Sequence, residues 1–153
     1  MTSFPDTCDQ RNHTFVESAI IPAPIDKVWS FIGNFGDAAA WHPMIASSQW
    51  RDDAHTVRIL QVKDGPLVEE VQLPAPKYKS RYMFLNAPIP VLKQYGGVIS
   101  LKPITHGVHA GQTFVTIKGR AYVRPEDQDQ ARATLRLNYT VGLENLATLC
   151  SSE

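Results

Sequence analysis

The chain has 153 residues, and its 15 Lys and Arg balance 15 Asp and Glu, so the formal net charge is zero. A hydrophobic content of 43% and a charged content of 20% are ordinary for one globular domain. This balance gives no reason to expect nucleic acid or an anionic membrane as a partner, because both attract basic surfaces.

No apolar run approaches the roughly 20 residues of a membrane span, and the polar N-terminus lacks the apolar segment of a secretory signal. We therefore expect a cytoplasmic protein, monomeric or homodimeric, with a flexible arm over residues 1–13 and one domain over residues 14–150. Cys8 and Cys150 are then expected to be free thiols.

The first predicted elements are a strand over residues 14–21 and two short helices. Pro22 and Pro24 end the strand, and apolar side chains then recur at helical spacing over residues 25–32. Glycines end this first helix, and residues 38–41 form a second short turn that Pro43 closes. Two short helices in an otherwise strand-rich chain suggest a lid over one end of a sheet.

Six further strands are predicted from alternating apolar residues and the turns between them. An Asp64-Gly65 turn joins two of the strands as a hairpin. Gly96 and Gly97 lie within a strand and indicate a bulge or bend. The predicted strands cover residues 45–50, 56–63, 67–73, 78–85, 94–102 and 112–123.

The last predicted element is a long helix over residues 125–150. Pro125 and nearby acidic residues are typical of a helix N-terminus, and apolar residues then repeat at helical spacing. This order of elements predicts an α+β fold, in which a curved antiparallel sheet of seven strands wraps around the helix. Space left between sheet and helix would be an apolar cavity, the usual place for a small ligand.

Several short motifs occur along residues 14–149 in a distinctive order. They are IPAP at 21–24 with Val28-Trp29, residues 32–35, AWHP at 40–43, Asp64-Gly65 before VEEV at 68–71, Tyr82 before PIPV at 88–91, and YTVGLENL at 139–146. In this order the chain resembles the START/Bet v 1-like superfamily and, within it, the polyketide cyclase/dehydrase branch. The resemblance implies a helix-grip fold around a cavity.

The resemblance also implies a hydrophobic small molecule as ligand or substrate, with no cofactor. An enzyme of this kind would be a cofactor-independent cyclase or dehydratase acting on a polyketide-like intermediate. A non-catalytic carrier of a hydrophobic compound and a partner-binding module remain as alternatives, because one fold supports many functions. The chain departs from the family where Ile117 replaces a common aromatic residue, Ser80 a common tyrosine, and Pro74-Ala75-Pro76 an acidic strand end.

Glu69 is the predicted acid–base residue. Alternation puts it on one strand face with Leu67, Val71 and Leu73, and we expect this more apolar face to line the cavity. Burial raises the pKa of a carboxyl group, which suits a general acid or base. The alternative is an ion pair with a cross-strand arginine such as Arg58 or Arg81.

Tyr82 and His42 complete the predicted catalytic set. Tyr82 shares an inward face with Ser80 and Phe84, where its phenol could act beside Glu69 or serve only as a core tyrosine. His42 lies in the turn at the expected cavity mouth, where it could transfer protons or could face solvent or bond backbone groups.

The other predicted ligand contacts come from the lid, the sheet and the last helix. They are Trp29, Trp41, Leu67, Val71, Ser80, Phe84, Ile117, Leu135, Asn138, Tyr139 and Gly142. For the helix residues, ordinary core packing is the alternative. His106 and His109 are too few to indicate a metal site, so we predict none.

Overall fold

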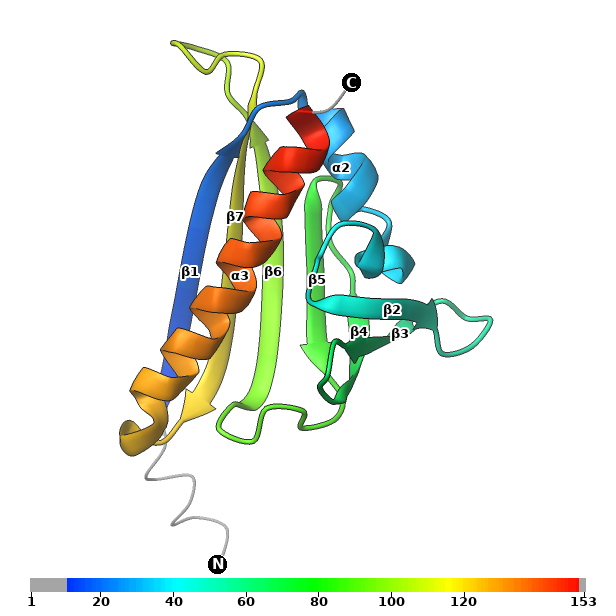
Figure 1. Ribbon diagram of the computed structural model, residues 1–153, viewed down its shortest axis with the longest axis vertical. Coiled ribbons are helices and arrows are strands. Elements are labelled where there is room, and N and C mark those ends of the chain that lie inside the picture. Colours follow the sequence, from blue (N-terminus) through cyan, green and yellow to red (C-terminus); the bar gives the residue numbers. More distant parts are fainter. Residues whose placement is uncertain (1–10, 152–153) are drawn as a thin grey trace, which may run out of the picture.

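The computed structural model describes residues 11–151 and contains one antiparallel sheet of seven strands (Figure 1). The strands are β1 (Arg11–Ile21), β2 (Ile45–Trp50), β3 (Val57–Val62), β4 (Leu67–Leu73), β5 (Lys79–Phe84), β6 (Lys93–Pro103) and β7 (Thr113–Val123). The helices are α2 (Ile25–Ile32) and α3 (Gln128–Ser151), with 3-10 helices η1 (Phe35–Ala40) and η2 (Pro125–Asp127). The spatial order of the strands is β1-β7-β6-β5-β4-β3-β2.

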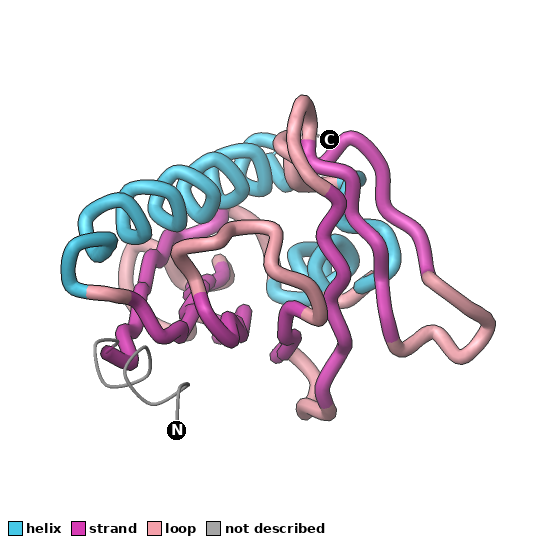
Figure 2. Tube along the Cα trace, turned by 90° about the horizontal axis from the view of Figure 1, so that it is seen from below, coloured by secondary structure: helices cyan, strands magenta, loops and turns pink. Residues whose placement is uncertain are grey.

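All of the helices lie on one side of the sheet. In Figure 1 α3 lies in front of β1, β7 and β6, whereas α2 and η1 lie beside its C-terminal end. Figure 2 shows the sheet bending around this helical side. The predicted α+β helix-grip architecture is confirmed, including the lid formed by two short helices.

The first strand begins earlier than predicted. It starts at Arg11 rather than at Thr14, because β1 pairs with β7 along its full length, from Arg11 opposite Val123 to Ile21 opposite Thr113. Three residues of the expected arm therefore belong to the sheet. The rest of that arm, residues 1–10 with Cys8, lies outside the described residues. Cys150 is a buried free thiol, and burial raises its pKa.

The core lies between α3 and the concave face of the sheet. Alternate residues of β7 are buried, as expected for a strand with one face on a core. Residues of α3 at helical spacing meet them, namely Ala131, Leu135, Tyr139, Leu143, Leu146 and Cys150. Among the described residues, no helix combines the length and the hydropathy needed to cross a bilayer.

Replacing Leu146 by Ala tests this packing, because its side chain is fully buried. We expect the free energy of unfolding to fall by about 3 kcal/mol, through lost burial and the cavity left behind. Leu137 on the same helix is 57% exposed, so Leu137→Ala is the matched control and should change stability by less than about 0.5 kcal/mol. Equal losses in urea unfolding of the two variants would contradict the assignment of the core face.

Candidate functional site

A cavity of about 280 Å³ lies between the sheet, the lid and α3. Its walls are mainly apolar, with Trp41 and Met44 from the lid, Ile89 from the β5–β6 loop, and Leu135 from α3. Polar side chains gather at one end, where Arg58, Glu70, Tyr82 and Tyr95 from the sheet and Tyr139 from the last helix all reach the wall. The cavity is thus an apolar space with one polar end.

A buried ion pair forms part of this polar end. Arg58 on β3 and Glu70 on β4 are cross-strand partners, and both are nearly inaccessible to solvent. Nε of Arg58 donates to Oε1 of Glu70 at 2.7 Å, and Nη2 lies 2.5 Å from the same oxygen. The pair is charge-assisted and multiply bonded, which is the geometry in which a buried pair recovers the cost of desolvation.

Arg58 also fastens the lid to the sheet. Its Nη1 donates to the carbonyl oxygen of Phe35 in η1 at 2.9 Å. The guanidinium lies 3.7 Å from the centroid of the Phe35 ring, which adds a cation–π contact. One side chain therefore neutralises Glu70 and positions the first residue of η1.

The second carboxylate oxygen of Glu70 is free to receive a ligand. Oε1 takes both bonds from Arg58, whereas Oε2 has no hydrogen-bond partner among the described residues. Oε2 is also not among the enclosed, unsatisfied side-chain atoms of that part of the chain, and Glu70 lines the cavity. A hydroxyl or an acidic C–H of a bound molecule therefore finds a hydrogen-bond acceptor there.

Three tyrosines from three elements meet beside this pair. The hydroxyls of Tyr95 on β6 and Tyr139 on α3 hydrogen-bond to each other, and the ring of Tyr82 on β5 lies 6.4 Å from that of Tyr95. Burial raises the pKa of Tyr82 to about 12, and the negative charge of Glu70 adds to the effect. Burial likewise raises the pKa values of Tyr95 and Tyr139. All three phenols stay protonated near neutral pH and can act as donors.

Two glycines make room for these phenols. Gly97 on β6 and Gly119 on β7 are cross-strand partners. A Cβ atom on Gly97 would lie 2.6 Å from the hydroxyl of Tyr82, and one on Gly119 would lie 2.7 Å from the hydroxyl of Tyr95. The β6–β7 register does shift, but between Lys93 and Gly96, so the irregularity precedes the predicted position and Gly96 and Gly97 themselves pair regularly. The close approach of the tyrosines to the sheet depends on the missing side chains.

His42 lies at the cavity wall and links the lid to α3, with both ring nitrogens in hydrogen bonds. Its Nε2–H donates to the backbone carbonyl of Asn138 at 3.0 Å, and Nδ1 accepts the backbone N–H of Met44 at 3.2 Å. The ring packs on Gly142, where a Cβ atom would lie 2.9 Å from Cδ2. Burial lowers the pKa of His42. The bonding matches the predicted alternative, in which His42 bonds backbone groups, and leaves neither ring nitrogen for a substrate.

The prediction that Glu69 faces the cavity is wrong. Val68 and Glu70 are the buried residues of β4, whereas the Glu69 side chain is 38% exposed and pairs with Arg51 at 3.5 Å. Leu67 and Val71 lie on this outer face with Glu69, and neither lines the cavity. The more apolar face of β4 is the outer one, because the inner face carries an ion-paired glutamate that lowers its apparent hydrophobicity.

The other predicted contacts divide into two groups. Those that line the cavity are Tyr82, His42, Trp41, Phe84, Ile117, Leu135, Asn138 and Tyr139. Ser80 is buried beside Tyr82 as its inward face predicts, but it does not reach the wall. Trp29 packs edge-on against Tyr78, with ring centroids 5.9 Å apart, and Gly142 supports His42. These three residues are corrections to the predicted ligand contacts.

Arg58, Glu70 and Tyr95 are the functional candidates that the sequence reasoning missed. Arg58 entered only as a possible partner of Glu69, and Tyr95 lies next to the Gly96-Gly97 bulge. The one sequence feature that these three residues share is that strand alternation places each side chain on the inner face of the sheet. Within the described residues, no three His, Cys, Asp or Glu side chains lie close enough together to hold a metal ion.

Replacing Glu70 by Gln tests the buried pair. The Arg58 guanidinium would stay buried without its counter-charge, and we expect about 3 kcal/mol or more of lost stability. Glu69→Gln removes a solvent-screened pair and should cost less than about 1 kcal/mol. Denaturant unfolding of both variants gives the comparison, and a larger loss for Glu69→Gln would reverse the assignment of the inner face.

The buried, hydrogen-bonded His42 predicts a loss of stability in mild acid. The folded protein holds His42 neutral with a lowered pKa, whereas the unfolded chain takes up a proton near pH 6.5. The unfolded state then binds more protons, so stability falls as pH drops below about 6.5. His42→Gln cannot titrate, and its melting temperature should decline less than that of the wild type between pH 7.5 and pH 5.5. Parallel declines would exclude His42 as the cause.

Comparison with known proteins places this geometry in context. Residues 12–151 match the family model described as polyketide cyclase/dehydrase and lipid transport. Comparison with curated protein sequences gives no match.

Solved structures share the fold over almost the whole chain. An uncharacterised protein from Bacillus thuringiensis superposes with a TM-score of 0.81 at 24% identity, covering 92% of this chain and 100% of the other. XoxI from Bacillus cereus superposes with a TM-score of 0.79 at 25% identity, covering 90% of this chain and 94% of XoxI. The Zhui aromatase/cyclase from Streptomyces sp. R1128 superposes with a TM-score of 0.69 at 16% identity, covering 92% of this chain and 94% of the other.

Proposed function

The chain belongs to the polyketide cyclase/dehydrase and lipid transport family, and we propose that it is a cofactor-independent cyclase or dehydratase for a hydrophobic, polyketide-like intermediate. The observation that carries the proposal is the polar end of the cavity. A free carboxylate oxygen of Glu70 and the protonated phenol of Tyr82 border the same apolar space. An acceptor and a donor together suit a substrate that carries both carbonyl and hydroxyl groups.

The cavity limits the size of the substrate. Its volume of about 280 Å³ lies just below the range for small-molecule sites, roughly 300–1,000 Å³. A compact molecule of one or two rings, or a short folded chain, fits this space. Trp41 and Phe84 provide flat walls for such a ring.

In the proposed reaction the phenol of Tyr82 donates a hydrogen bond to a substrate carbonyl. Oε2 of Glu70 removes a proton from the adjacent carbon, and the resulting enolate carbon attacks a second carbonyl of the same chain. That proton passes from Glu70 to the resulting alkoxide and gives a hydroxyl group. Glu70 then removes the second proton from the same carbon and delivers it to the hydroxyl, which leaves as water while the double bond forms. Most of the acceleration comes from holding the chain folded, since orientation alone contributes several kcal/mol.

A non-catalytic carrier is the second candidate. It is favoured by the occupied nitrogens of His42 and by the raised pKa values of the three tyrosines, which make them poor proton donors for chemistry. A carrier raises its melting temperature with the ligand and returns the compound unchanged.

Tyr82→Phe tests the catalytic proposal, because it removes one hydroxyl and keeps the ring. With a synthetic linear tetraketide thioester as substrate, we expect turnover to fall at least tenfold, about 1.4 kcal/mol, with little change in KM. Product formation is followed by chromatography and by the mass loss of one water. Glu69→Gln on the outer face is the control and should keep wild-type turnover. Thermal stabilisation of the wild type by an unconverted thioester would favour the carrier instead.

A further inference from the structure

The outer face of the sheet concentrates positive charge, although the chain as a whole is neutral. Strand alternation and register place outward side chains of β1, β5, β6 and β7 on one surface. At the outward positions of these four strands there are five cations and no carboxylate, and Glu69 on the outer face of the neighbouring β4 is paired with Arg51. The cations are Lys79, Arg81, Lys102, Lys118 and Arg120. The net charge of zero gives no indication of this basic surface, because the acidic residues that balance the charge lie elsewhere in the fold.

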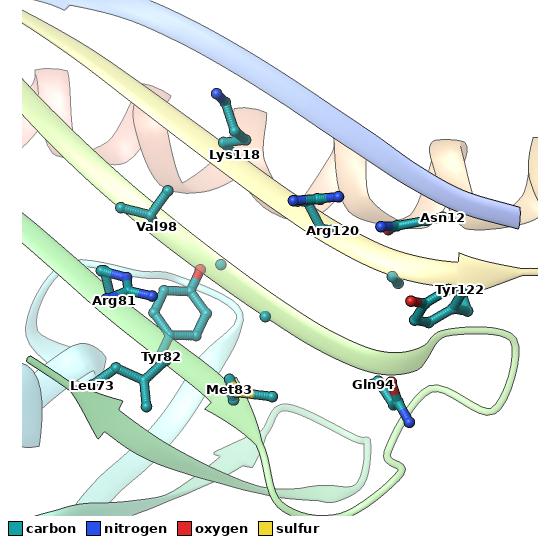
Figure 3. Close-up of a pocket in the computed structure, with 13 residues that line it drawn as sticks. Asn12, Leu73, Arg81, Tyr82, Met83, Gln94, Val98, Lys118, Arg120 and Tyr122 are labelled. Carbon is teal, nitrogen blue, oxygen red and sulfur yellow. The ribbon is translucent and has the colours of Figure 1, made fainter.

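This surface contains a groove of about 390 Å³, shown in Figure 3. The groove exists because Gly96 has no side chain between its two cross-strand neighbours, Arg120 on β7 and Met83 on β5. Along the next row, Val98 lies between Lys118 and Arg81. Figure 3 shows Lys118 and Arg120 on one side of the groove and Arg81 on the other.

The cations around the groove have no acidic partner. Among the described residues, Lys118 and Arg120 form no ion pair or hydrogen bond, and Arg81 donates only to the backbone carbonyl of Pro74 at 3.1 Å. Lys118 and Arg120 are two residues apart, about 7 Å along the strand, and Arg81 is two strands away, about 10 Å. Long flexible side chains at this spacing can converge on one anionic group.

The groove also offers apolar and aromatic surface next to the charges. Met83 and Tyr122 both line it, and each is 38% exposed. A ligand that pairs with the cations can therefore pack a hydrophobic portion against these side chains. Three cations around one groove favour a doubly charged phosphate group over a singly charged carboxylate, and an arginine fork can hold two of the phosphate oxygens.

We propose that this groove is a second binding site, for an organic phosphate ester whose dianionic group is held by Arg81, Lys118 and Arg120. Its hydrophobic portion lies against Met83 and Tyr122. Face-to-face pairing of two copies is disfavoured, because it would oppose like charges. A flat bilayer would not reach the floor of a groove formed by a missing side chain. The site lies on the opposite face of the sheet from the cavity, and Tyr82 borders both spaces. Its ligand is distinct from the substrate proposed for the cavity.

Titration of the ¹⁵N-labelled protein with phenyl phosphate tests this site. We expect saturable shifts of the Gly96 and Gly97 amide signals. Arg120→Glu should weaken binding at least tenfold, whereas Lys102→Glu, on the same face but outside the groove, should change it less than twofold. Shifts spread over all basic residues, or equal losses in both variants, would overturn the proposal in favour of general surface electrostatics.

Three further measurements define the ligand class. Benzoate has the same ring with one charge and should bind at least fivefold more weakly, so equal affinity would overturn the requirement for a dianion. Gly96→Val fills the groove, with its Cβ 3.3 Å from Cγ of Met83, and should abolish phenyl phosphate binding. Co-sedimentation with phosphatidylserine vesicles, without saturable binding of phenyl phosphate, would assign the face to a membrane and overturn the proposal.

Discussion

The ion pair between Arg58 and Glu70 determines how the sheet, the lid and the cavity fit together. Burying two charges costs several kcal/mol per ion unless their geometry and hydrogen bonds recover it. Here Glu70 supplies the counter-charge, and the Phe35 carbonyl and ring complete the surroundings of Arg58. The cavity wall can carry a carboxylate because this partner is already in place. A polar end inside an apolar space follows from that one contact.

The positions of the three tyrosines depend on a second constraint, which is that two facing residues of the sheet are glycines without side chains. Gly97 and Gly119 face each other across β6 and β7, and the phenols of Tyr82, Tyr95 and Tyr139 occupy the space above them. The hydroxyls therefore lie close to the backbone of the sheet, far from bulk water. Burial keeps them protonated, and their directions are set by one another rather than by solvent.

Periodicity predicted most of the fold, because burial on one face of a strand or helix leaves a direct trace in the sequence. Leu67–Leu73 was predicted with its observed bounds, and Tyr82 was placed on the correct face with Ser80 and Phe84. The strand start at Arg11 was missed because pairing with the long neighbouring strand β7, not local propensity, extends β1.

The candidate site was harder to predict because it contradicts simple hydrophobic patterning. Glu69 and Glu70 are neighbours on opposite faces, and counting apolar residues selected the wrong one. The partner that makes burial of Glu70 possible lies twelve residues away on β3. Likewise, Gly97 and Gly119 make room for the tyrosines only once β6 and β7 pair. Features that depend on a partner distant in sequence leave no local periodic signal.

The attachment of the lid has a consequence for how a molecule reaches the interior. The segment from Phe35 to Met44 is fastened by Arg58 to the sheet, by His42 to α3, and by the Asn145 amide, which donates to the Trp41 carbonyl at 2.7 Å. Across the mouth, the β5–β6 loop contributes Pro88 and Ile89 to the wall without such cross-links to the lid or α3 among the described residues. This loop is therefore the part of the cavity wall that can shift without breaking a hydrogen bond to the lid or to α3.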